Sequence, residues 1–214
     1  MTERSRTDVD AVVLAAGASR RLGRPKQLED IGGKAVIAHV VDNIVESGAC
    51  RRIAVVLPPD PELALTIRKA LAGRKLTFTE NGCAESPMLH SIKLGIAALP
   101  TPLYGIMVAL GDQPLVLPAT ILALCRRPRR DGVVIPRLNG RSGHPIVIGT
   151  FILHDVLAIP AASSLKEFID SRRSLVRYIS VPDIGTVMDV DTQRDLDAVR
   201  DVYRVRMELR WADG

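Results

Sequence analysis

The sequence predicts an α/β protein built on a single doubly wound, mostly parallel sheet with helices on both faces. Short β-type runs alternate with segments of helical period along all 214 residues, which favours crossover connections and parallel strands. The run from Gly105 to Leu110 is wholly small or apolar, as expected of a central strand buried on both faces. No repeat, linker or low-complexity tract divides the chain. We therefore expect one domain over residues 9–214, preceded by a flexible N-terminus at residues 1–8.

The first half of the chain predicts four strands and three helices. The strands are rich in aliphatic and β-branched residues and are expected at 10–15, 52–57, 75–79 and 105–110. The helices are expected at 35–46, 62–72 and 91–99. In the first helix the apolar residues follow the i, i+3, i+4, i+7 spacing of a buried stripe, and Gly48 closes it. Gly73 and Pro100 end the other two.

The second half continues the alternation. Helices are expected at 119–125, 164–171 and 192–208, and strands at 132–136, 144–148, 175–181 and 187–190. Thr192 begins the last helix as N-cap, with Asp195 three residues later, which is a capping-box pattern.

Composition excludes several classes of protein. Hydrophobic residues make up 47% of the chain and charged residues 25%, which excludes wholesale disorder. No apolar run approaches the roughly 20 residues of a membrane helix, so we expect no membrane association. Aromatic residues are only 3% and no nucleic-acid module is recognisable, so no nucleic-acid partner is expected. The three widely spaced cysteines form no CxxC or metal-finger pattern, which favours a reducing, cytoplasmic protein.

The net charge of +5 leaves a polyanionic ligand open, and the loop after the first strand can bind one. Its sequence is Leu14-Ala15-Ala16-Gly17-Ala18-Ser19-Arg20-Arg21-Leu22-Gly23-Arg24-Pro25-Lys26. Ligands of doubly wound sheets bind beyond the carboxyl ends of the strands, where small residues let backbone N–H groups approach phosphates. The loop is neither GxGxxG nor a Walker loop, and a solvated basic turn is the alternative. The residues expected to bind a nucleotide here are Leu14, Ala15, Ala16, Gly17, Ser19, Arg20 and Gly23.

Two acidic segments are candidates for a metal site. Asp112 follows the central strand, between Gly111 and Gln113-Pro114, and a hard cation such as Mg²⁺ needs only one or two carboxylates besides phosphate oxygens. Asp189 and Asp191 share one face of the expected strand at 187–190, and we favour Asp191 as the second metal-facing carboxylate. The alternatives are that Asp112 caps a turn and that the other two serve the N-terminus of the last helix. The role of Asp189 is left open.

The loop also carries a family resemblance. The pattern Leu14-Ala15-Ala16-Gly17-x-Ser19-x-Arg21-Leu22-Gly23-x-Pro25-Lys26 resembles the signature of the MobA-like nucleotidyltransferases. The double alanine before Gly17 is similar to the branch typified by molybdenum cofactor cytidylyltransferase. The resemblance implies a Rossmann-like nucleotidyltransferase domain over 9–214 and matches Asp112 to the metal-binding Asp of a Gly-Asp-x-Pro motif. Sugar-nucleotide pyrophosphorylases and the cytidylyltransferase of the methylerythritol phosphate pathway share the loop, so it does not by itself choose among these enzymes.

Two further segments extend the resemblance. Gly143-His144-Pro145 resembles the Gly-His-Pro segment of the cytidylyltransferase branch, which implies that these three residues line the acceptor pocket. Ser91 and Gly95 fit a family frame in which serines open a helix, although His90 stands where serine is commoner. Asn81, Ser91 and Gly111 are accordingly expected to bind the nucleotide.

The implied activity is Mg²⁺-dependent transfer of a nucleoside monophosphate, CMP from CTP, to a phosphorylated acceptor with release of pyrophosphate. The implied acceptor is molybdopterin or the molybdenum cofactor, and a molybdoenzyme that receives the product is a further partner. Arg21, Lys26 and Asp112 would be catalytic, with the metal on Asp112 and Asp191. Two alternatives stay open: a different phosphorylated acceptor, such as a sugar phosphate or phospho-acid, and a non-catalytic factor for molybdoenzyme maturation.

Overall fold

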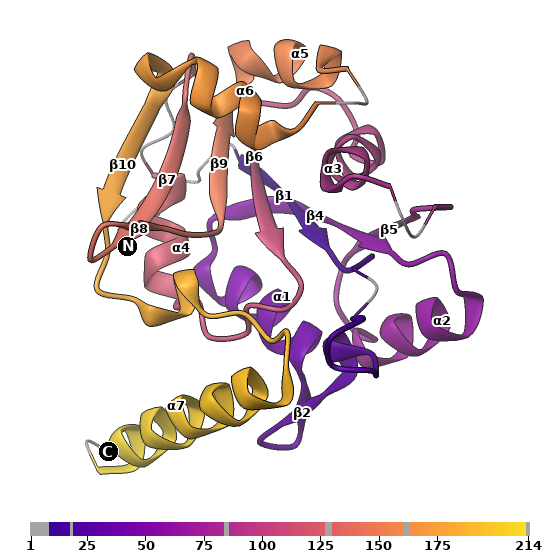
Figure 1. Cartoon of the computed structure of the whole chain (residues 1–214), viewed down its shortest axis with the longest axis vertical. Helices are drawn as coiled ribbons and strands as arrows, with labels where there is room; N and C mark the ends of the chain where they lie inside the picture. Colours follow the sequence, from indigo (N-terminus) through magenta and orange to yellow (C-terminus); the bar gives the residue numbers. More distant parts are fainter. Residues whose placement is uncertain (1–8, 18, 84–85, 127–129, 161–162, 213–214) are drawn as a thin grey trace, which may run out of the picture.

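The computed structural model describes residues 9–212 except 18, 84–85, 127–129 and 161–162, so the expected flexible segment 1–8 lies outside it. One eight-stranded sheet crosses the molecule in the order β10-β7-β9-β6-β1-β4-β5, with β8 paired to β7 (Figure 1). The strands in chain order are β1 (Val9–Leu14), β4 (Cys50–Leu57), β5 (Thr77–Glu80), β6 (Gly105–Leu110), β7 (Val133–Leu138), β8 (Arg141–Ser142), β9 (Ile146–Gly149) and β10 (Val176–Ser180). Four neighbouring pairs of strands are parallel, namely β1 with β4, β1 with β6, β4 with β5 and β7 with β10, whereas β9 runs antiparallel to both β6 and β7. The predicted α/β class with a mostly parallel sheet is confirmed.

Helices cover both faces of the sheet, and each face has its own core. One core joins β1, β4 and β6 to α1 (Val36–Ser47), α2 (Pro61–Ala70) and α4 (Pro118–Cys125). The other lies beneath α3 (Met88–Ala97), α5 (Thr150–Ala158) and α6 (Leu165–Ser171). Successive side chains of β1 point to opposite faces of the sheet, so Val13 packs in the first of these cores and Val12 in the second. The apolar interior of the strands thus leaves only their ends for polar chemistry.

The last helix, α7 (Gln193–Ala212), lies outside these two layers (Figure 1). It packs on the two-stranded hairpin of β2 (Asp30–Ile31) and β3 (Lys34–Ala35) through a third apolar cluster that includes Ile31, Val36 and Leu196. Arg200 of α7 also donates to the carbonyl oxygen of Asp30 at 3.0 Å. This hairpin was not predicted, and it ties the C-terminal helix to the chain that follows the first loop.

The structure departs from the prediction at two further places. The helix α5 was not predicted, although its apolar residues bury one side of it in the second core. The predicted strand at 187–190 is wrong: a short 3-10 helix at Ile184–Val187 precedes an extended stretch outside the sheet. Val190 instead donates to the backbone oxygen of Asp112 at 3.0 Å. The hydrogen bond of this segment is accepted by the loop at Asp112 and not by a neighbouring strand. The segment therefore crosses the carboxyl edge of the sheet and does not join it as a strand.

Within the described part of the chain, no helix combines the length and the apolar character that crossing a membrane requires.

Candidate active site

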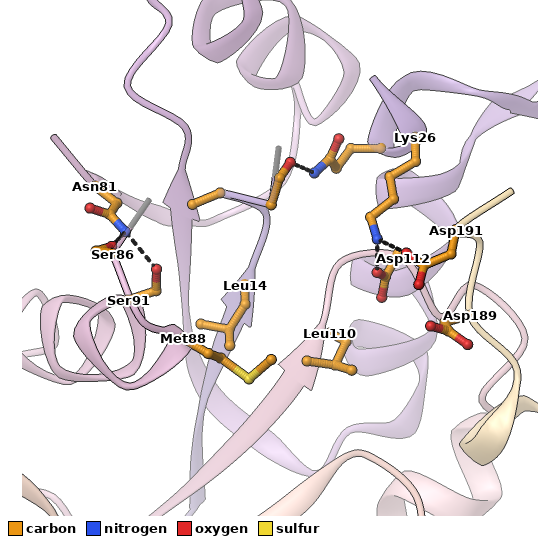
Figure 2. A pocket seen from close by; sticks show the side chains of 13 residues that line it. Leu14, Lys26, Asn81, Ser86, Met88, Ser91, Leu110, Asp112, Asp189 and Asp191 are labelled. Atoms are coloured by element: carbon orange, nitrogen blue, oxygen red, sulfur yellow. Dashed lines mark hydrogen bonds and ion pairs between the residues drawn. The ribbon is translucent and has the colours of Figure 1, made fainter. Parts of the chain in front are cut away.

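A cavity of about 330 Å³ opens at the carboxyl ends of β1 and β6 (Figure 2). Leu14 and Leu110 are the last residues of these two strands, pair in register, and form part of its wall. The lining residues are Leu14, Ala16, Gly17, Lys26, Gln27, Asn81, Ser86, Met88, Ser91, Leu110, Asp112, Asp189 and Asp191. The cavity therefore lies where a doubly wound sheet binds its ligands.

The loop after β1 is folded by its own side chains. The buried Gln27 donates through Nε2 to the carbonyl oxygens of Ala15 at 2.9 Å and Gly17 at 3.1 Å. Ser19 adopts a left-handed conformation, with φ of 48°, and its Oγ accepts a hydrogen bond from the Lys26 backbone at 3.1 Å. These contacts turn the chain back on itself and direct the Lys26 side chain into the cavity. The sequence analysis did not predict Gln27 as a site residue. Its one local indication is that a polar residue stands between Lys26 and the apolar Leu28.

The polar end of the cavity holds three carboxylates and one ammonium group. Asp112, Asp189 and Asp191 each offer an oxygen within 4.8 Å of the others. Lys26 Nζ lies 2.5 Å from Asp112 Oδ2 and 2.6 Å from Asp191 Oδ1 (Figure 2). The exposed Arg21 reaches Asp191 from the solvent side at 2.5 Å. The structure thus joins the three predicted catalytic residues and adds Asp189 to them.

These carboxylates fit a divalent cation. Asp112 Oδ1 is buried and has no hydrogen-bond partner among the described residues, so one oxygen is available for a further ligand. Hard cations such as Mg²⁺ prefer oxygen ligands and take few from the protein when phosphates supply the rest. The residues that would hold the ion are Asp112 and Asp191, with Asp189 beside them.

The charges of this cluster act on one another. Burial and the neighbouring charges of Asp112 and Asp191 raise the pKa of Asp189. Burial disfavours the charged forms of Lys26 and Asp191 as well, but their ion pairs outweigh it, which raises the pKa of Lys26 and lowers that of Asp191. The ion pair between Lys26 and Asp191 is therefore maintained at neutral pH, whereas Asp189 disfavours its charged form.

The other end of the cavity is lined by uncharged polar side chains and by apolar ones. The side-chain amide of Asn81 donates to Ser86 Oγ at 2.6 Å and Ser91 Oγ at 2.8 Å, and its Oδ1 accepts from the Cys83 backbone at 3.0 Å. Met88 and the leucines of β1 and β6 line the cavity next to this polar group (Figure 2). Such a combination of amide, hydroxyl and apolar surface can hold a flat polar ring.

Helix α3 reaches this end because one glycine lets it approach the sheet. A Cβ on Gly95 would lie 2.3 Å from Val12 Cγ1, so only glycine permits this packing distance. The helix begins at Met88, three residues before the predicted start, and Ser91 consequently lies inside its first turn.

The residues predicted for the nucleotide and metal sites fall into three groups. Those that line the cavity are Leu14, Ala16, Gly17, Lys26, Asn81, Ser91, Asp112 and Asp191. Ala15 and Gly111 are buried behind the wall, where Gly111 donates to the Leu14 carbonyl oxygen at 2.9 Å. Arg20 and Gly23 lie on the exposed turn outside the lining. Of the lining residues, sequence reasoning missed Gln27, Ser86, Met88 and Leu110, and it left Asp189 open.

Gly143, His144 and Pro145 lie beside the cavity and not in its lining. Gly143 packs against Thr186 so closely that a Cβ would lie 2.1 Å from the Thr186 carbonyl oxygen, and the His144 backbone donates to that same oxygen at 2.9 Å. Burial lowers the pKa of the His144 imidazole to about 4, although the negative charge of Asp189 acts to raise it. The ring is therefore neutral at pH 7.

We expect His144 to make the protein less stable in mild acid. Its ordinary pKa of about 6.5 applies to the unfolded chain, whereas the folded pKa is about 4. Between these values only the unfolded chain binds the proton, so the free energy of unfolding falls as the pH decreases, by up to about 2 kcal/mol at pH 5. Urea unfolding at pH 7 and pH 5 measures this loss, and His144→Gln should show a smaller one. Equal losses in both proteins would contradict the assignment.

Comparisons with known proteins agree with this geometry. A family model described as the MobA-like NTP transferase domain matches residues 11–176. The bifunctional protein GlmU of Azorhizobium caulinodans is 31% identical over 175 residues, which are 81% of this chain but only 38% of that protein. This chain therefore spans less than half the length of that relative.

Two solved structures show the same fold. A nucleotidyl transferase from Methanothermobacter superposes with a TM-score of 0.80 at 23% identity, covering 92% of this chain and 98% of that one. Rv0371C of Mycobacterium tuberculosis, in a complex with manganese, superposes with a TM-score of 0.70 at 24% identity, covering 90% and 98%. The cavity lies at the end of β1 with the signature loop beside it, and the family model matches most of the length of the chain. The chain therefore belongs to the MobA-like NTP transferase family.

Proposed function

We propose that this protein transfers CMP from CTP to a phosphorylated acceptor, in a reaction that requires Mg²⁺ and releases pyrophosphate. One observation carries the proposal: a lysine from the glycine loop pairs with two of three clustered carboxylates from two other segments, at one end of a cavity that can hold a nucleotide. Phosphoryl-group chemistry needs mainly positioning and charge stabilisation, and these residue types supply both.

The loop and the far end of the cavity would bind different parts of the nucleotide. The backbone around Ala16 and Gly17 would face the triphosphate, with Lys26 supplying positive charge to its oxygens. Asn81, Ser86 and Ser91 would contact the base, between Met88 and the strand-end leucines.

Asp112 and Asp191 would hold the metal, which when bound supplies positive charge at the reacting phosphorus and its oxygens. The manganese complex of a protein with the same fold supports a divalent cation in this group of proteins. Lys26 would stabilise the charge that develops as the acceptor phosphate attacks and pyrophosphate leaves. No general base is required, because the attacking phosphate is already ionised.

The acceptor would approach from the side of Gly143, His144 and Pro145. The charge of Asp189 acts on His144, so this segment lies next to the acidic cluster. A neutral imidazole can donate or accept one hydrogen bond without adding charge. We propose molybdopterin or the molybdenum cofactor as acceptor, on the resemblance of the double alanine and of this segment, with a molybdoenzyme as recipient of the product.

The test is incubation of the protein with Mg²⁺, the acceptor and radiolabelled CTP or GTP, with pyrophosphate measured in parallel. We expect label to move from CTP to the acceptor with one pyrophosphate released per transfer. Faster turnover of GTP would contradict the nucleobase, and turnover only with a sugar phosphate or phospho-acid would contradict the acceptor. Tight acceptor binding with no nucleotide turnover would indicate a maturation factor instead.

A further inference from the structure

Lys26 stands between the two carboxylates that are the candidate metal ligands. Its ammonium group lies 2.5 Å from Asp112 Oδ2 and 2.6 Å from Asp191 Oδ1, and its side chain is only 12% exposed. Arg21 adds a second positive charge to Asp191. One oxygen of each of these two carboxylates is thus already paired with a cation, while Asp112 Oδ1 has no hydrogen-bond partner among the described residues.

A divalent ion and the ammonium group hinder each other at these positions. Mg²⁺ binds carboxylate oxygens at about 2.1 Å and demands near-octahedral geometry, so an ammonium group within hydrogen-bond distance of two of its ligands crowds the ion. The two cations also repel each other, and this repulsion is strong because the cluster is partly shielded from water. Either Lys26 leaves the carboxylates or the ion binds weakly.

We propose that Lys26 takes the place of the metal in the nucleotide-free protein, so that Lys26 and a divalent cation compete for Asp112 and Asp191. The inference deepens the proposed function, on which its metal site rests. The competition means that the protein alone binds divalent cations weakly, and that the ion enters with the triphosphate.

The loop provides the place to which Lys26 moves. Its Cε lies 3.9 Å from the position of a Cβ on Gly17, so the side chain already runs beside the segment expected to face the triphosphate. A phosphate chain at Gly17 gives the ammonium group a new partner, while the metal takes its former ones. Each ligand therefore removes an obstacle to the other, which is positive coupling between the two sites.

The test is the affinity for Mn²⁺ alone, without nucleotide, measured by electron paramagnetic resonance or calorimetry. Lys26→Met keeps most of the length of the side chain and removes its charge. We expect this variant to bind Mn²⁺ about tenfold more tightly than the unaltered protein, or more tightly still, although a residue that aids catalysis has been lost. Its melting temperature should also rise more when Mn²⁺ is added.

Two matched variants control for charge and folding. Lys34→Met removes an equal charge from an exposed lysine whose partner is Asp42, and should leave the Mn²⁺ affinity unchanged. Lys26→Arg keeps a cation in the loop and should bind Mn²⁺ about as weakly as the unaltered protein. Circular dichroism and the melting temperature establish that each variant is folded.

The outcomes separate this inference from the proposed function. Unchanged or weaker Mn²⁺ binding in folded Lys26→Met would overturn the competition, whatever the activity of the unaltered protein. Tighter binding in that variant, together with no transfer from any nucleotide in the unaltered protein, would support the competition and reject the proposed transferase activity.

Discussion

Asp112→Asn is expected to lower the rate of nucleotidyl transfer about a thousandfold while the protein stays folded. Asn keeps the shape of the side chain but lacks the negative charge that favours a divalent cation, and it offers one oxygen in place of two, of which Asp112 Oδ1 has no other partner among the described residues. A loss of this size is typical when one electrostatic contributor to a transition state is removed. Pyrophosphate release from CTP in the presence of Mg²⁺ and acceptor measures it.

The stability of Asp112→Asn should change little. Lys26 keeps Asp191 as a partner, and one of the charges that raises the pKa of Asp189 is gone. We expect a melting temperature within about 4 °C of the unaltered protein. Asp201→Asn, which alters an exposed aspartate of α7 paired with Arg204, is the matched control and should keep full activity. A folded Asp112→Asn protein with full turnover would refute the metal assignment.

Arg52→Met is expected to be the most destabilising of the substitutions considered, at about 3 kcal/mol. Asp10 is completely buried in β1, and its carboxylate accepts two hydrogen bonds from Arg52, at 2.8 and 2.6 Å. After the substitution, the cation that remains near this carboxylate in the described part of the chain is Arg51, whose Nε lies 4.0 Å away. A buried charge without a close partner is costly, whereas the pair itself contributes little compared with an apolar replacement. Urea unfolding at pH 7 measures the change.

Three comparisons test this explanation. Arg204→Met breaks an exposed ion pair with Asp201 and should cost less than about 1 kcal/mol. The double variant Asp10→Val with Arg52→Met removes both charges and should recover much of the lost stability. Because Asp10 lies at the amino end of β1, opposite the cavity, transfer activity should persist in folded Arg52→Met. A cost equal to that of Arg204→Met would contradict the buried-charge explanation.

Part of the site was predictable because it depends on local rules. The loop after β1 and Asp112 after β6 each follow an apolar strand, and parallel strands present their carboxyl ends at one edge. Lys26 and Asp191 were predicted as separate features. Their contact at 2.6 Å joins residues that are 165 positions apart, so no local pattern contains it.

Other features required the folded chain. The stretch at 187–190 has a strand-like pattern, but its backbone bonds to the loop at Asp112 instead of to the sheet. That bond carries Asp189 into the acidic cluster, a role which alternation on a strand left undecided. Gln27 was missed for the same reason, since its buried amide is explained only by the carbonyl oxygens of Ala15 and Gly17.

The sequence by itself determined the α/β class, the edge of the sheet that carries the site, and the residue types that meet there. Hydrophobic periodicity and the ends of strands can be read from neighbouring residues. Alternating strands and helices can bury their apolar faces in only a small set of layered architectures. Only the tertiary structure decided that Lys26 pairs with the candidate metal ligands, because the balance of these charges depends on distance and burial. Those quantities exist only once β1, β6 and the segment before α7 have come together.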